Sequence, residues 1–312
     1  MFDTVNFRLL QDEAGQVEFL SETPQYLENV AEHTYAHGET VITGNLSGLS
    51  VWLSRYQMKI KDGSLCKWYL GDNYQTLGRG DTQRAIEKLS DTLHLPIGKA
   101  TVIRMDLAQN FIVQHPPEVY FNHLGILGYA QRLQEPNGIY YKLAGGRLAF
   151  YDKNREQKEK RQPIPELYKG RNVLRYEQRY IRRIAAQFKS EVTGSMLFDE
   201  AFYIGLLKRW KDAYKAIEKI NDSDITLNLE AVKTKKQLYQ RGVLLQIKEA
   251  GGLIPMLEKI KEAQKRGELT KKEAFDLRRA INEAAQMNGL TTPNEAIKEL
   301  DKKVRDSVRF YR

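Results

Sequence analysis

Three short segments of the sequence place side chains that could do chemistry two residues apart. They are Arg104 and Asp106 in VIRMDLA, Tyr151 and Lys153 in AFYDKNR, and Arg175 and Glu177 in LRYEQR. Residues two apart in a β-strand share a face, opposite the residues that lie between them. In strand form, the three pairs would bring two carboxylates, one phenol and three cations to polar faces of a sheet. Such a set is sufficient for phosphoryl transfer.

Tyr151 is the candidate nucleophile in this set. A tyrosine hydroxyl can attack phosphorus and form a covalent phosphotyrosine, which divides one difficult step into two easier ones. Its ordinary pKa of about 10 means that the phenolate must be stabilised, either by the Lys153 ammonium or by a metal ion. Asp106 and Glu177 could hold a hard divalent ion through oxygen, and that ion would polarise the phosphate. The alternative is that these residues have no catalytic role and form ion pairs between strands on a solvent-exposed face of the sheet.

The elements that would position these residues are strands in the first part of the chain. Runs rich in β-branched and aromatic residues predict strands at 2–10, 49–60, 64–70, 101–113, 138–143, 146–153 and 172–180. The segment 61–63, KDG, is typical of a hairpin turn between two of them. A helix is expected from near Asp81, and a second short one from Pro116-Pro117. Alternation turns Tyr176 to the apolar face of its strand, so it competes poorly with Tyr151 as the nucleophile.

The charged segment 153–163, KNREQKEKRQP, is interpreted as an exposed loop that follows the Tyr151 strand. As a solvated connection it would have no further role; as a phosphate-contacting loop it would bring Lys158, Lys160 and Arg161 to DNA. From about Thr193 onward, apolar residues repeat at helical spacing. We therefore expect an α+β protein, with an antiparallel-sheet domain over 1–192 and an all-helical accessory domain over 193–312.

Composition limits the function classes. The 312 residues carry a formal net charge of +9, which favours a polyanionic partner, because clustered Lys and Arg displace counterions from phosphates. A single cysteine excludes an internal disulfide and a cysteine-built zinc site. No apolar run is long enough to span a bilayer, and the N-terminal segment lacks a secretory pattern. We expect a cytoplasmic protein without membrane contact.

Read in order, the segments GSLCKWYLGDN, VIRMDLAQNF, PPEVYFNHLG, LAFYDKNRE and LRYEQR resemble the replication initiators of filamentous phages, the gene II/X family. They are also similar to the rolling-circle initiators of small plasmids. The resemblance covers roughly residues 1–190. It implies a divergent relative of the HUH nicking endonucleases, with a metal-bearing antiparallel sheet and a catalytic tyrosine.

The resemblance also implies roles for particular residues. The Tyr-x-Lys motif of the family matches Tyr151 and Lys153, and its acidic positions match Asp106 and Glu177 as metal ligands. No His-x-His pair is present, so a mostly carboxylate site would favour Mg or Mn. The third ligand stays open among Asp72, Glu118 and Glu156. Arg104 and Arg175 are expected to contact DNA beside the site.

The function implied is a rolling-circle replication initiator that nicks one strand at an origin, forms a 5′-phosphotyrosine and later rejoins the displaced strand. Its expected partner is origin DNA, single-stranded or cruciform, and the helical region could bind a host helicase or a second copy of the chain. Two alternatives remain: a relaxase-like transfer nickase and a non-catalytic single-stranded nucleic-acid binder whose sheet presents aromatic side chains to bases.

Overall fold

The structure is a computed structural model that describes residues 1–220, 222–223, 232–285, 291–292 and 294–311. The chain forms two compact units that interleave along the sequence: one comprises 1–113, 129–215 and 303–312, the other 114–128 and 216–302. We call them the sheet unit and the helical unit. The functional division expected at residue 192 is not tested by these contacts and stays a prediction.

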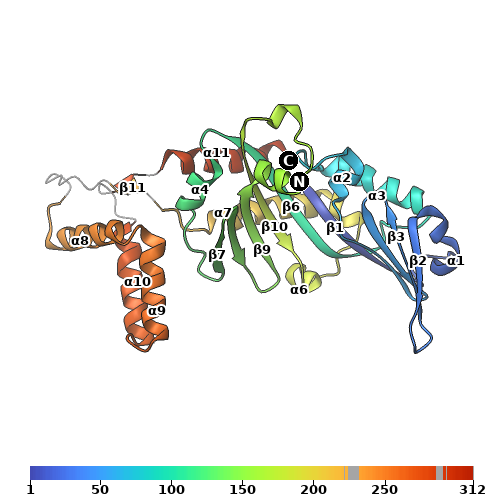
Figure 1. Cartoon of the computed structure of the whole chain (residues 1–312), viewed down its shortest axis with the longest axis horizontal. Helices are drawn as coiled ribbons and strands as arrows, with labels where there is room; N and C mark the ends of the chain where they lie inside the picture. Colours follow the sequence, from blue (N-terminus) through green and yellow to red (C-terminus); the bar gives the residue numbers. More distant parts are fainter. Residues whose placement is uncertain (221, 224–231, 286–290, 293, 312) are drawn as a thin grey trace. The chain divides into compact units, whose positions relative to one another are not determined.

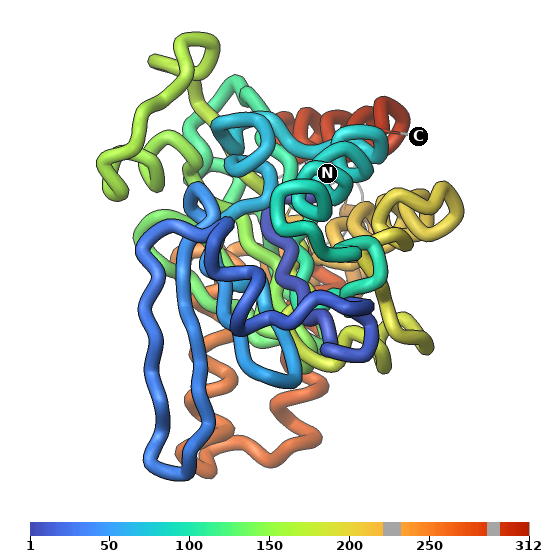
Figure 2. Tube along the Cα trace, turned by 90° about the vertical axis from the view of Figure 1, so that its right-hand side faces the viewer, coloured from blue at the N-terminus to red at the C-terminus, as the bar shows by residue number. Residues whose placement is uncertain are grey.

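A ten-stranded antiparallel sheet forms the centre of the sheet unit (Figure 1). Its spatial order is β2-β3-β4-β5-β1-β6-β10-β9-β8-β7, and the β2–β3 hairpin projects from one end (Figure 2). The strands are β1 Phe2–Leu10, β2 Glu28–Thr34, β3 Thr40–Leu46, β4 Leu49–Ser54, β5 Gln57–Lys61, β6 Thr101–Val113, β7 Gln131–Glu135, β8 Gly138–Lys142, β9 Gly146–Asp152 and β10 Asn172–Tyr180. The strands that carry the three candidate pairs, β6, β10 and β9, are therefore neighbours at the middle of the sheet.

Alternation assigns the two faces of β9 and β10 as the sequence predicted. Phe150 and Tyr176 lie opposite each other in register, and their rings stack with centroids 4.4 Å apart. Helix α7 (Glu200–Lys215) covers this face: the Trp210 ring lies 4.6 Å from that of Tyr176, and the Tyr214 ring 6.2 Å from that of Phe150. We call this set the aromatic face. It leaves the opposite face of the same strands to the polar side chains.

The short helices of the sheet unit connect or flank the strands. They are α1 Phe19–Glu22, α2 Leu65–Leu70, α3 Arg79–Leu93, α5 Lys153–Glu159 and α6 Ile184–Phe188, with 3₁₀ turns at Pro24–Tyr26, Glu166–Tyr168 and Ser195–Phe198. The expected helix near Asp81 is α3. The strand expected over 49–60 is two strands, β4 and β5, that pair with each other.

The strand expected over 64–70 was wrong, because this segment is helix α2. Its N-terminus is capped by Ser64, whose side chain accepts a hydrogen bond from the Lys67 amide at 3.1 Å, and Gly71 ends it in the left-handed region, at φ 89°. The turn at 61–63 consequently leads β5 into a helix and is not a hairpin between strands. The aromatic residues suggested a strand, but the capping residues at both ends decide the structure.

The interpretation of 153–163 as an exposed loop was also wrong for its first part, which is helix α5. Asp152 ends the strand and caps the helix: its side chain accepts the Arg155 amide at 3.0 Å. Oppositely charged residues three and four apart then support the helix, for example Arg155 and Glu159. The same charge density that suggested a loop is therefore compatible with a short helix.

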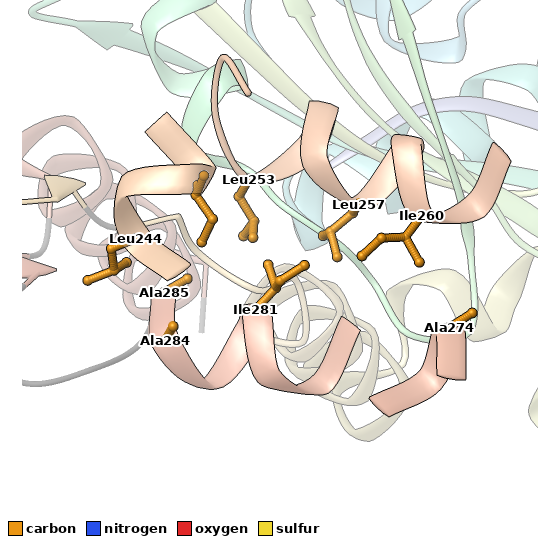
Figure 3. Close-up of a cluster of buried hydrophobic side chains, with 9 residues drawn as sticks. Leu244, Leu253, Leu257, Ile260, Ala274, Ile281, Ala284 and Ala285 are labelled. Carbon is orange, nitrogen blue, oxygen red and sulfur yellow. The ribbon is translucent and has the colours of Figure 1, made fainter. Parts of the chain in front are cut away.

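The helical unit contains α4 Pro117–His123, which begins at the expected proline pair, and α8 Lys235–Glu249, α9 Leu253–Lys265 and α10 Lys271–Ala285. Leu244, Leu257 and Ile281 belong to the buried apolar cluster that joins the last three helices (Figure 3). Two-residue strands β11 (Asp222–Ser223) and β12 (Thr291–Thr292) pair with each other, and α11 (Glu295–Phe310) contributes residues to both units. The expected α+β class with a helical C-terminal region is confirmed.

Within the described part of the chain, no helix is both long and apolar enough to cross a bilayer.

Candidate active site on the central strands

Tyr151 lies at the end of β9 on the polar face and lines a cavity of about 890 Å³ in the sheet unit. Its side chain is 7% exposed, and its hydroxyl donates a hydrogen bond to Glu177 Oε1 at 2.7 Å. Burial, followed by the Glu177 carboxylate, holds the pKa of Tyr151 well above its usual value. The phenol is therefore protonated in this arrangement.

Gly138 on β8 is the register partner of Tyr151. A Cβ atom at this position would lie 2.8 Å from Tyr151 Cβ, closer than side-chain carbons approach each other. Glycine here allows β8 to pair closely with the end of the Tyr151 strand.

Glu177 on β10 is the centre of an ion-pair network. Arg175 Nε donates to Glu177 Oε1 at 2.5 Å, and Arg179 pairs with Oε2. Burial alone would raise the pKa of Glu177, but Arg175 and Arg179 outweigh it and hold that pKa well below the usual range. Glu177 is therefore a carboxylate that accepts the phenol hydrogen bond.

Arg104 and Asp106 lie on the same face of β6, as strand alternation predicts, and they form an ion pair. Arg104 Nε and Nη2 donate to the two oxygens of Asp106 at 3.1 and 2.6 Å. The carboxylate is almost fully buried, and burial raises its pKa in spite of Arg104. Both side chains line the same cavity as Tyr151.

Arg175 is wholly buried, and all three nitrogens of its guanidinium donate hydrogen bonds to protein groups. Besides Glu177, it donates to Asp3 Oδ2 at 2.6 Å, the Asn73 carbonyl at 2.9 Å and Asn110 Oδ1 at 3.2 Å. In this arrangement it positions carboxylates, and its expected contact with DNA stays a prediction.

Lys153 does not follow the strand rule applied to it, because it is the first residue of α5. Its ammonium is buried and donates to Glu156 Oε2 at 2.8 Å, and it lies 5.6 Å from the centroid of the Tyr74 ring. Burial, and next Arg175, lowers the pKa of Lys153 to about 8. Lys153 is thus held beside the site, and its proposed action on the phenolate stays a prediction.

Of the other cations expected to meet DNA, Lys158, Lys160 and Arg161 are exposed at the end of α5 and just after it. Lys160 lines the cavity and pairs with Glu156.

The predicted metal ligands do not fit a divalent cation in this arrangement. Asp106 and Glu177 line one cavity, but their oxygens accept from Arg104, Arg175 and Arg179. Over the described ranges, no group of three or more His, Cys, Asp or Glu side chains could hold a metal ion.

The three candidates for the third ligand have different surroundings. Glu156 lines the cavity, but Lys153 and Lys160 pair with it. Asp72 accepts the Tyr74 amide at 2.8 Å, and Glu118 belongs to α4 in the helical unit.

Sequence reasoning missed two residues of this site, Arg179 and Asp3, and discounted a third, Tyr140. Arg179 continues the two-residue spacing of Arg175 and Glu177, so its signal was present in NVLRYEQRY. Asp3 lies in the first strand, between Phe2 and Thr4, but only the fold brings it to Arg175 across more than 170 positions of the chain. Tyr140 also lines the cavity, and it precedes Lys142 by the same spacing that links Tyr151 to Lys153.

A buried tyrosine that hydrogen-bonds a carboxylate thus lies among arginines in a cavity of an antiparallel sheet. The model for the N-terminal part of the phage replication-associated protein of the gene II type matches residues 1–202. The chain belongs to this family of phage-associated rolling-circle replication initiators, whose members are generally endonucleases. A search of curated proteins found no match.

Proposed function

We propose that the protein nicks one strand of origin DNA through Tyr151 and later rejoins it. The observation that supports this proposal is the hydrogen bond from the Tyr151 hydroxyl to Glu177 inside an arginine-lined cavity, within the part of the chain that the family model matches. A hydroxyl held on a strand suits a reaction that depends on alignment.

The first step forms a bond between Tyr151 Oη and phosphorus and breaks the bond from phosphorus to the 3′ oxygen. The phenol proton passes to Glu177 and from there to solvent, while the leaving 3′ oxygen takes up a proton from water. The product is a 5′-phosphotyrosine with a free 3′ hydroxyl that can prime synthesis. Attack by a 3′ hydroxyl in the reverse direction rejoins the strand without ATP, because the phosphotyrosine keeps the energy of the bond.

Arg104 and Arg179 are two of the cations that line this cavity together with Tyr151. Guanidinium groups bind phosphate oxygens well because their N–H donors form a planar fork. When the scissile phosphate enters, we expect them to share their donors between the phosphate and the carboxylates. When Arg179 shares its donors with the phosphate, the pKa of Glu177 rises, because Arg179 is one of the cations that hold it low, and this carboxylate becomes a better acceptor for the phenol proton.

A requirement for Mg or Mn is a separate part of the proposal, and none of the steps above runs through a metal. Binding of such an ion would require Arg104 or Arg179 to release a carboxylate. We also propose that the protein acts in the cytoplasm on single-stranded or cruciform origin DNA, with the helical unit available to a host helicase or to a second copy of the chain.

The test is incubation with labelled single-stranded DNA that tiles the replicon encoding the protein, with Mg, Mn or chelator, followed by a denaturing gel. The proposal predicts a covalent adduct that Tyr151→Phe abolishes. Tyr140→Phe is the matched control, because Tyr140 lines the same cavity, and it should keep the adduct.

Three other outcomes separate the alternatives. Cleavage only at a transfer origin, without support of replication, would indicate a transfer nickase. Tight binding with no adduct under any condition would indicate a non-catalytic binder. An adduct of equal yield in chelator would remove the metal from the proposal.

A further inference from the structure

Three cations occupy directly opposite positions on three neighbouring strands of the sheet. Lys142 on β8 is the register partner of Arg147 on β9, and Arg147 is in turn the partner of Arg179 on β10. We call this set the cationic row. Residues directly opposite in an antiparallel sheet share a face, and like charges in such positions destabilise the sheet.

Arg147 is the cation in the row whose repulsion by its neighbours is least compensated. It is half-buried, its Nε is buried without a hydrogen-bond partner, and no ion pair joins it to a carboxylate among the residues that the structure describes. Burial and the neighbouring Arg179 lower the pKa of Arg147, which is the direction expected for a cation in an unfavourable environment. By contrast, Arg179 is compensated by Glu177.

The position of Arg147 relates it to Tyr151. Both residues lie on β9, four positions apart, so their side chains project from the same face at a separation of about 13 Å at 3.3 Å per residue. Both line the same cavity. Because the two side chains leave β9 at different points, Arg147 can contact a phosphate other than the one that Tyr151 attacks.

The guanidinium of Arg147 is also held in place. Its Cζ lies 5.3 Å from the centroid of the Tyr140 ring, a distance at which a cation is attracted to an aromatic face. Tyr140 thus orients the guanidinium without using its hydrogen-bond donors, and the donors of the two Nη atoms are left for an anion.

We infer that Arg147, with the exposed Lys142 beside it, forms a phosphate-binding subsite for the single strand adjoining the nick. This inference rests on the proposed function and adds a residue to it: Tyr151 acts on one phosphate while Arg147 holds a different one along the same strand. The ligand is the backbone of single-stranded DNA, read through its charge and not through its bases.

The test uses the full chain, in chelator, with a fluorescent mixed-sequence single-stranded DNA of about 12 nucleotides, within the site sizes of single-strand binders. Arg147→Gln should weaken binding about tenfold, as expected for the loss of one charge-assisted hydrogen-bonded contact. The slope of log Kd against log salt should also fall by about 0.7, the value for one phosphate contact on a single strand. Arg147→Lys keeps the charge and should keep the slope.

Arg171→Gln is the matched control, because it removes the same charge from an exposed residue that does not line the cavity. It should change neither the affinity nor the slope measurably. Thermal unfolding adds a second readout: Arg147→Gln should unfold at the same temperature as the parent protein or higher, since it relieves repulsion in the row.

Unchanged binding in Arg147→Gln would overturn the inference. So would weaker binding with an unchanged salt slope and a lower unfolding temperature, which would mean that Arg147 stabilises the fold. If Tyr151 forms no adduct but Arg147→Gln behaves as expected, the nicking proposal fails while the phosphate subsite stands.

Discussion

The two faces of strands β9 and β10 differ in chemistry, because one is packed with aromatic rings and the other carries a buried network of charges. One face carries Phe150 and Tyr176, which pack under Trp210 of α7, and Tyr176 donates its hydroxyl hydrogen to the Trp210 carbonyl at 2.9 Å. The other carries Tyr151 and Glu177 with buried arginines. Aromatic packing is tolerant of pH and salt, whereas a buried charge network is stable only while every member has its partner.

This difference between the faces shows how one sheet can combine a stable core with a polar site. The aromatic face holds the strands in register by burial, so the polar face is free to accumulate charges that would not stabilise a fold by themselves. Variants on the two faces should therefore separate stability from chemistry.

Trp210→Ala should have the largest effect on stability. Removing a fully buried tryptophan from the aromatic face is expected to lower the free energy of unfolding by about 3–5 kcal/mol. Denaturant unfolding measures this loss. The adduct yield per folded molecule should stay at the parent level, and a large fall in that yield would break the separation between the faces.

Glu177→Gln should have the next largest effect, and it should lower both the stability and the yield of the adduct. It leaves the buried Arg175 with fewer negative partners, and breaking a buried pair costs about 3 kcal/mol. It also removes the carboxylate that accepts the phenol proton, so adduct formation should be lost. Glu166→Gln, at an exposed pair with Lys169, is the control and should change stability little. Full adduct formation by Glu177→Gln would contradict the role of this carboxylate.

Glu156→Gln should have the smallest effect on stability, and this loss should be present at neutral pH and diminish in acid. Burial alone would raise the pKa of Glu156, but Lys153 and its other partners lower it from 4.5 to about 2. Because the folded pKa lies below the unfolded one, this group contributes stability above about pH 4.5 that is lost as the pH falls towards 2. The variant should therefore lose stability less steeply across that range. Parallel thermal-unfolding curves from pH 5 to pH 2 for parent and variant would contradict this.

Much of the polar face could be predicted from the sequence, because strand alternation is a local rule. Spacing alone placed Arg104 beside Asp106 and Arg175 beside Glu177, and it turned Tyr176 to the other face. The rule failed at Lys153, where Asp152 ends the strand and caps a helix. It failed for the same reason at 64–70, where Ser64 and Gly71 cap α2.

The other contacts of the site depend on pairing between strands that are distant in the sequence, and the sequence alone does not reveal that pairing. Asp3 meets Arg175 only because β1 and β10 flank β6, and Arg147 meets Lys142 and Arg179 only through the register of β8, β9 and β10. The guanidinium partners of the expected metal ligands likewise follow from this packing.

The most direct test of the central claim is to map the covalent bond to one side chain. After reaction with origin-derived single-stranded DNA, nuclease and protease digestion, and mass spectrometry, the nucleotide mass should lie on the peptide that contains Tyr151. A nucleotide on Tyr140 or any other residue, or no modified peptide from a reaction that cleaved DNA, would contradict the assignment of Tyr151 as the nucleophile.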